Sequence, residues 1–159
     1  MIEIIEADLS TEQQSTALLT LLNDYAVELG GEGKVLPEYT RAHLIDELKK
    51  RKSIYIVMAY VNEEAAGLVI TIEGFSTFAA KPLFNIHDVV VAPRFRGRGI
   101  SKMMLEKVEK EARARECCKL TLEVLEHNHV AKNLYRSFGF VSYELDPSYG
   151  KAEVMEKKL

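Results

Sequence analysis

The stretch that decides the fold runs from Val89 to Lys102 and reads VVVAPRFRGRGISK. Its first part is a β-branched run that Pro93 stops, because proline cannot continue the hydrogen bonding of a strand. Its last part begins an amphipathic helix near Gly99. Between the two lie glycines and three arginines, which bring positive charge and open backbone N–H groups to a helix N-terminus. Such a turn suits a phosphate or diphosphate group.

Two widespread phosphate loops differ from this turn. The dinucleotide-binding fingerprint has a third glycine where this chain has Lys102, and the ATP-binding loop has a Gly-Lys-Ser/Thr sequence that is absent here. Nicotinamide cofactors and nucleoside triphosphates are therefore less suitable ligands. The structural alternative is a helix start whose glycines only turn the chain.

Hydrophobic periodicity outward from this stretch predicts an α/β fold. Strands are expected at residues 2–7, 54–61, 67–72, 84–92, 119–125, 140–145 and 152–157, and helices from 11 to the glycines at 30–33, at 40–52, 99–115 and 130–138. Residues 74–82 have no clean period and are expected to be an irregular excursion. The order predicts a mixed, mostly antiparallel central sheet of about seven strands, with helices on both faces. We expect a single domain over residues 1–159.

Composition excludes several classes of protein. The chain has 159 residues, of which 47% are hydrophobic, and no apolar run approaches the roughly 20 residues that a membrane helix needs. The first residues carry acids where a signal peptide has bases, so a cytoplasmic protein without a membrane partner is expected. Cys117 and Cys118 are adjacent, a spacing that fits neither a disulfide framework nor a zinc site.

The charge is distributed unevenly along the chain. Residues 1–92 carry 14 acidic and 7 basic side chains, whereas residues 93–115 carry 8 basic and 3 acidic ones. One compact cationic segment in an acidic protein favours a small anionic ligand and argues against nucleic-acid binding. A solvated helix face rich in Lys and Arg is the alternative.

Two motifs resemble the GNAT superfamily of acyl-CoA-dependent N-acyltransferases. The first is Arg94-x-x-Gly97-x-Gly99 after the valine-rich strand, and the second is N-x-x-A-x-x-L-Y-x-x-x-G-F from Asn128 to Phe140. The predicted element order is also similar to that of the superfamily. Within it, the sequence GFSTF at 74–78 and the strand NIHD at 85–88 resemble the diamine and polyamine acetyltransferase branch.

The resemblance implies that acetyl-CoA is the co-substrate. It implies that main-chain groups of Val89 and Val91 bind the pantetheine arm, that N–H groups of residues 96–101 bind the diphosphate, and that Asn128 binds the arm from the second motif. The residues expected at this site are Val89, Val91, Arg94, Arg96, Gly97, Arg98, Gly99, Ile100, Ser101, Lys102, Asn128 and Tyr135. Ser101 departs from the small residue, often glycine, that the family has there.

Acetyl transfer to an amine requires a base for the ammonium proton and an acid for the departing thiolate. His87 and Asp88 are the candidate bases by position, and strand alternation allows only one of them to face the acceptor. The alternative for His87 is a half-buried strand histidine that is hydrogen-bonded to a neighbouring carbonyl. The polyamine branch usually has Glu at the position of His87. Tyr135 is the candidate acid, with an aromatic packing role as the alternative. His127 and His129 lack further ligands at metal-binding spacing, so no metal is expected.

These inferences predict an N-acetyltransferase that moves an acetyl group to a primary amine by direct transfer in a ternary complex. The alternative is a non-catalytic acyl-CoA sensor. A small-molecule amine is the expected partner, and a homodimer is the expected assembly. Carboxylates of the acidic half, among them Glu28, could attract a cationic amine, but the sequence assigns none of them this role.

Overall fold

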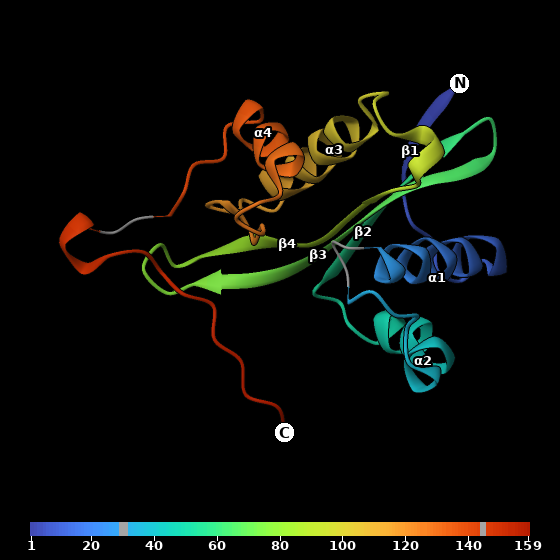
Figure 1. Ribbon diagram of the computed structural model, residues 1–159, viewed down its shortest axis with the longest axis horizontal. Helices are drawn as coiled ribbons and strands as arrows, with labels where there is room; N and C mark the ends of the chain where they lie inside the picture. Colours follow the sequence, from blue (N-terminus) through green and yellow to red (C-terminus); the bar gives the residue numbers. More distant parts are fainter. Residues whose placement is uncertain (29–31, 144–145) are drawn as a thin grey trace. The chain divides into compact units, whose positions relative to one another are not determined.

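The computed structural model describes residues 1–28, 32–143 and 146–159. It forms two compact units, Met1–Glu123 and Val124–Leu159, and each is described by itself. Among the described residues, the first unit contains the sheet and three α-helices, and the second contains one α-helix (Figure 1).

The sheet of the first unit has five strands within the described residues. They are β1 (Ile2–Glu6), β2 (Ile54–Val61), β3 (Glu64–Ser76), β4 (Lys81–Val91) and β5 (Leu120–Leu122). They lie side by side in chain order; the first four pair antiparallel and β5 pairs parallel to β4. The parallel pair is possible because α3 crosses back over the sheet between these two strands. The predicted mixed, mostly antiparallel sheet is therefore confirmed.

The helices are α1 (Glu12–Val27), α2 (Glu38–Lys49) and α3 (Ile100–Ala114) in the first unit and α4 (His129–Ser137) in the second. Helix α1 begins where predicted, because the side chain of Thr11 accepts a hydrogen bond from the N–H of Gln14. Short 3-10 turns lie at Pro93–Phe95 and Pro147–Tyr149. None of the helices in the described ranges is both long and apolar enough for a membrane crossing.

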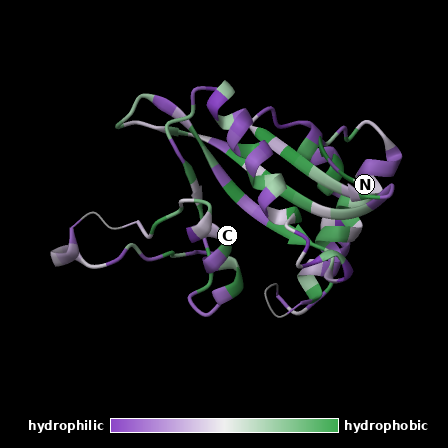
Figure 2. Cartoon of the chain, turned by 90° about the horizontal axis from the view of Figure 1, so that it is seen from above, coloured by the Kyte–Doolittle hydropathy of each residue, from purple (hydrophilic) through white to green (hydrophobic). Residues whose placement is uncertain are grey.

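Helices cover both faces of the sheet in the first unit, as predicted. On one face Leu18 and Leu21 of α1 pack with a buried cluster that includes Met58, Leu68 and Val90. Neighbouring strand residues point to the opposite face, where Met104 of α3 lies against Gly67. Figure 2 shows the strands as mainly hydrophobic and the helices as mixtures of hydrophobic and hydrophilic turns. The strands are thus the centre of a core with a helix layer on each side.

The expectation of about seven strands is wrong. Residues 140–143 and 152–157 form no strand, and residues 144–145 lie outside the described residues. The alternation at these segments indicated a buried face, yet Val141 is 88% exposed and Val154 is 75% exposed. Without an apolar surface to cover them, the alternating residues have no reason to be extended and paired.

The expectation of an irregular excursion at 74–82 is also wrong. Strands β3 and β4 remain paired as far as Ser76 opposite Lys81, so the segment is the tip of a long hairpin. A strand shows alternating apolar and polar residues only where one of its faces is buried. At this tip Phe75 and Phe78 are both exposed, so no such alternation is present. The backbone pairing therefore continues where the hydropathy pattern has ended.

The close contact between β3 and α3 predicts that Gly67→Ala destabilises the fold. A Cβ at Gly67 would lie 2.8 Å from Met104 Cε and 3.0 Å from the Val90 carbonyl oxygen. Chemical denaturation should show a loss of about 1–3 kcal/mol, the usual cost of overpacking. The matched control is Gly74→Ala in the same strand, whose Cβ would lie at an ordinary 3.5 Å from Leu83. Equal stability of the two variants would contradict this account of the packing.

Candidate functional site

The loop between β4 and α3 has a backbone that requires glycine at two positions. Gly97 has φ of +76° and Gly99, the N-cap of α3, has φ of +75°, a left-handed conformation that residues with a Cβ rarely adopt. A Cβ at either glycine would meet no atom within 4 Å. The two glycines therefore shape the turn without packing against the protein, and their surroundings are open.

This turn leaves a row of backbone donors free. The first α3 hydrogen bond runs from the N–H of Met103 to the Gly99 carbonyl, at 3.1 Å. In the part of the chain that the structure describes, none of the N–H groups of residues 97–102 has an acceptor. Unpaired donors at the start of a 15-residue helix lie at the positive end of its dipole. The arrangement fits the oxygens of a phosphate or diphosphate group.

Beside this loop, strand β4 has an edge that is only partly paired. Strand β5 pairs with β4 at Phe84–Ile86, and beyond Ile86 the described residues provide no neighbouring strand on that side of β4. The N–H of Ala92 donates to the Ala66 carbonyl at 2.9 Å, and direction alternates along an antiparallel strand. The main-chain groups of Val89 and Val91 therefore point away from β3, towards the open edge.

The cationic side chains of the loop have distinct partners. Arg94 forms an ion pair with Glu64, and its guanidinium lies 4.9 Å from the centre of the buried Phe95 ring. Arg98 lies 5.3 Å from the same ring. Phe95 thus supports two cations by a contact that the sequence analysis missed.

Arg96 is held by polar contacts. Its Nε donates to the Val91 carbonyl at 2.9 Å, and its Nη2 donates to both carboxylate oxygens of Glu28 at 2.7 Å. The remaining predicted loop residues differ in exposure: Ile100 is buried, Ser101 is half-buried and Lys102 is exposed. Ile100 anchors the helix start in the core, which leaves its backbone N–H as the group it offers to a ligand.

A bulge in β4 separates the two candidate bases. Ile70 of β3 lies opposite Asp88, but the next residue, Thr71, lies opposite Ile86. His87 is therefore the extra residue of a β-bulge, without a partner in β3, and it is exposed. Asp88 shares the face of Ile70, the face that α1 covers. Of the two candidates, Asp88 is the one that lies between the sheet and α1.

The environment of Asp88 changes its acidity. Burial raises the pKa of this carboxyl group above its ordinary value, and the neighbouring His87 partly opposes the change. On α1, burial also raises the pKa of Tyr25, and the negative charges of Asp88 and Glu28 add to that increase. Tyr25 therefore shares its surroundings with both carboxylates. The sequence predicted Tyr25 only as a member of the apolar face of a helix. Its polar hydroxyl group, at the end of that face, was the one feature that could have indicated a role in the site.

The two predicted site residues of the second unit belong to α4 and its cap. Asn128 is the N-cap, and its Oδ1 accepts a hydrogen bond from the N–H of Ala131 at 3.1 Å. Tyr135 is buried and packs edge-on against Phe140, with 5.8 Å between ring centres. His127 and His129 lie nearby with rings 6.3 Å apart. Among the described residues, no group of three or more His, Cys, Asp or Glu side chains is arranged to hold a metal.

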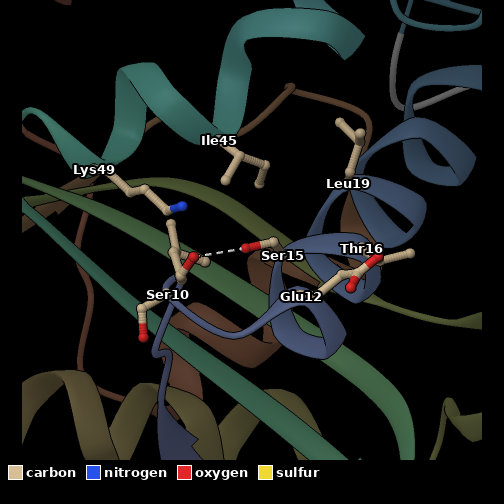
Figure 3. Close-up of a pocket in the computed structure, with 8 residues that line it drawn as sticks. Ser10, Glu12, Ser15, Thr16, Leu19, Ile45 and Lys49 are labelled. Carbon is tan, nitrogen blue, oxygen red and sulfur yellow. Dashed lines mark hydrogen bonds between the residues drawn. The ribbon is translucent and has the colours of Figure 1, made fainter.

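A pocket of about 380 Å³ lies elsewhere in the first unit, between the start of α1 and α2 (Figure 3). Its lining includes Ser15, Ile45 and Lys49, and the Ser15 hydroxyl donates to the Leu9 carbonyl at 2.8 Å. The pocket is at the opposite end of α1 from Glu28, so it contains none of the residues that the sequence predicted for the site.

The burial of Asp88 predicts a pH-dependent difference in stability. Because folding raises the pKa of Asp88, the folded state favours the protonated carboxyl group. The stability that depends on this protonation is fully present below the ordinary pKa of 3.8. It is lost as the pH rises through the pKa of the folded state. Asparagine does not ionise, so Asp88→Asn should have a higher free energy of unfolding than the parent at pH 7. The difference in free energy between the two proteins should shrink towards pH 4. Denaturant titrations across this range measure it. The exposed Asp24→Asn on α1 is the control, and a pH-independent difference for Asp88→Asn would contradict the prediction.

Comparison of the sequence with known proteins finds relatives that are acetyltransferases. The sequence resembles the thialysine N-epsilon-acetyltransferase of Caenorhabditis elegans, with 25% identity over 133 residues, 79% of this chain and 82% of that protein. The bovine (Bos taurus) protein of the same name is 34% identical over 65 residues, 41% of this chain and 38% of its own length.

The fold is similar to that of a solved ribosomal-protein-alanine N-acetyltransferase from Brucella melitensis. The TM-score is 0.78 at 18% identity, over 99% of this chain and 100% of that one. The sequence profile described as the Acetyltransferase (GNAT) family matches residues 16–140, which include both predicted motifs. The chain therefore belongs to the GNAT acetyltransferase family and is an acyltransferase.

Proposed function

We propose that this acyltransferase moves an acetyl group from acetyl-CoA to a primary amine by direct transfer while both substrates are bound. The observation that carries the proposal is the row of free N–H groups at residues 97–102 beside the open edge of β4. A helix start with free donors suits a diphosphate, and an open strand edge suits an extended arm that forms strand-like hydrogen bonds. Acetyl-CoA has both parts, and its thioester supplies the acetyl group.

The residues around the loop fit this ligand. Positive φ at Gly97 and Gly99, with open space at both, allows a diphosphate to approach the backbone closely. Arg98 and Lys102 add positive charge on the same turn. The main-chain groups of Val89 and Val91 would bind the pantetheine arm, and the role proposed for Asn128 in binding the cofactor rests on the resemblance of its motif to that of the family.

The acceptor is proposed to be a primary amine that arrives as a cation. Asp88 lies on the face of β4 that α1 covers, and the charges of Asp88 and Glu28 both raise the pKa of Tyr25 on α1. Two carboxylates near this tyrosine would attract an ammonium group. The names of the relatives point to an amine at the N-epsilon position of thialysine. Because a free alkylamine is protonated near neutral pH, the site must first remove a proton.

Asp88 is the proposed acceptor of that proton, directly or through a water molecule. A carboxylate whose pKa is raised by burial is a stronger base than an ordinary exposed one. Tyr135 is proposed to donate a proton to the departing thiolate. Its ring is buried and packs against Phe140, so replacement by phenylalanine separates the chemical role from the packing role.

Release of free thiol from acetyl-CoA tests the function. The panel comprises spermidine, short diamines, thialysine, lysine, lysine peptides, other amino acids and aminoglycosides. Amine-dependent thiol release is expected, with mass spectrometry showing one added acetyl group on the amine. Acetyl-CoA binding without release on any amine would favour the non-catalytic alternative, and absence of binding would contradict the proposal.

The phosphate loop predicts that Gly99→Val weakens binding of acetyl-CoA. The side chain would enter the open space in front of the free N–H groups, on a backbone whose φ disfavours valine. Calorimetry should show a dissociation constant at least about tenfold higher, a change of ~1.4 kcal/mol. Gly33→Val is the control, because Gly33 has φ of +71° and open surroundings but lies outside the loop. Unchanged affinity in Gly99→Val would remove the phosphate-loop hypothesis.

A proton donated by Tyr135 predicts a kinetic defect in Tyr135→Phe. The ring and its packing on Phe140 remain, so acetyl-CoA affinity should change little. Turnover should fall by about 100-fold, the low end of the contribution of a general acid. Phe140→Leu is a packing control that should affect stability more than turnover. Turnover equal to that of the parent would return Tyr135 to a packing role.

The bulge in β4 predicts different pH–rate profiles for the two candidate bases. Asp88→Asn should lower the rate and abolish the acid limb of the profile, because the proton acceptor is lost. His87→Ala should keep that limb, because His87 is the exposed bulge residue. The readout is kcat/KM for the best amine of the panel from pH 5 to 9. An acid limb that disappears in His87→Ala and persists in Asp88→Asn would assign the base to His87.

A further inference from the structure

We propose that Glu28 is a positioning residue that competes with the diphosphate of acyl-CoA for the side chain of Arg96. The pair acts as a clasp that holds Arg96 on the open edge of β4 until acyl-CoA displaces it. This inference rests on the acyl-CoA binding proposed above. It adds a role for Glu28, a residue to which the sequence alone assigned no function.

The contacts of Arg96 define the clasp. Its Nη2 donates to both oxygens of Glu28, and its Nε donates to the carbonyl of Val91, so one guanidinium joins two elements. Glu28 is the C-cap of α1, whereas Val91 ends β4, and 68 residues separate Glu28 from Arg96. The side chain of Arg96 therefore spans from the α1 end to the strand edge.

This position conflicts with the binding of an acyl-CoA arm. The carbonyl of Val91 points to the open edge, where an extended arm would pair with β4, and Arg96 already lies on it. An arm that binds there must move the Arg96 side chain. The adjacent turn at residues 97–102 would then hold a diphosphate, the kind of oxyanion that a guanidinium binds with paired hydrogen bonds.

The ion pair between Arg96 and Glu28 is weak enough for a ligand to displace it. The side chains of Arg96 and Glu28 are 49% and 34% exposed, so water screens their attraction. Such pairs contribute little to stability, and a diphosphate carries more negative charge than one carboxylate. Glu28 therefore lowers acyl-CoA affinity moderately without preventing binding.

Separation of Arg96 from Glu28 also changes the surroundings in which the amine substrate is proposed to bind. When Arg96 leaves, Glu28 loses its cation and remains as a carboxylate in the surroundings of Tyr25 and Asp88. Bound acyl-CoA should then increase the affinity for a cationic amine, because the same carboxylate serves first Arg96 and then the amine.

The test is a double-mutant cycle on acetyl-CoA affinity, measured by calorimetry without amine. Glu28→Gln should tighten binding by about two- to fivefold, up to ~1 kcal/mol, because the competing charge is removed. Arg96→Gln should weaken binding, and Glu28→Gln should have no further effect in the Arg96→Gln background. Asp24→Asn, the same change of charge one turn earlier on α1, is the control and should leave affinity unchanged.

The signs of these effects decide the proposal. In steady state, Glu28→Gln should lower KM for acetyl-CoA and raise KM for the amine, a divergence that partial unfolding does not produce. Glu28→Ala should act in the same direction. Weaker acetyl-CoA binding in Glu28→Gln would overturn the clasp, and so would equal tightening in Asp24→Asn. A parent protein that binds no acetyl-CoA would instead contradict the proposed function, so the two failures are distinct.

Discussion

The partial pairing of β4 is the constraint on which the rest of the first unit depends. This strand pairs with β3 from Lys81 to Val91, apart from the bulge at His87, but with β5 only at Phe84–Ile86. Its carboxyl end therefore has main-chain groups directed to an open edge, and a 3-10 turn at Pro93–Phe95 and the glycine loop lead from there to α3. An open strand edge and a helix N-terminus thus come together in one short segment, and each exposes backbone hydrogen-bonding groups that the fold leaves unused.

The bulge at His87 has a second effect on the same strand. Side chains of a strand alternate between the two faces of the sheet, and the extra residue in β4 shifts this alternation by one position after the bulge. Ile86 before the bulge and Val89 after it therefore both lie on the α3 face. Asp88 and Val90 lie on the face of α1, and a carboxyl group is thereby held in a largely apolar layer. The raised pKa of Asp88 follows from that burial. A regular strand would have paired His87 with β3 and shifted this register.

The sequence was sufficient where local chemistry decides the structure, and insufficient where tertiary pairing decides it. The turn around Gly97 and Gly99 was predictable because positive φ and a helix start depend on a few adjacent residues. The hairpin tip near Phe78 was not, because its residues are exposed on both faces and show no period. The bulge was not predictable either, since register depends on the partner strand. The contact between Glu28 and Arg96 joins residues too far apart in the chain for any local pattern to reveal.

The uneven charge of the sequence also has a structural explanation. Carboxylates of the acidic half neutralise arginines of the cationic segment one at a time, Glu64 with Arg94 and Glu28 with Arg96. Within the described ranges Arg98 and Lys102 have no carboxylate at ion-pair distance, so the uncompensated charge lies at the start of α3. Positive potential is therefore concentrated beside the free N–H groups, where the helix dipole has the same sign. Arg96 differs from both sets because its guanidinium contacts a carboxylate and also donates to the Val91 carbonyl on the open edge of β4.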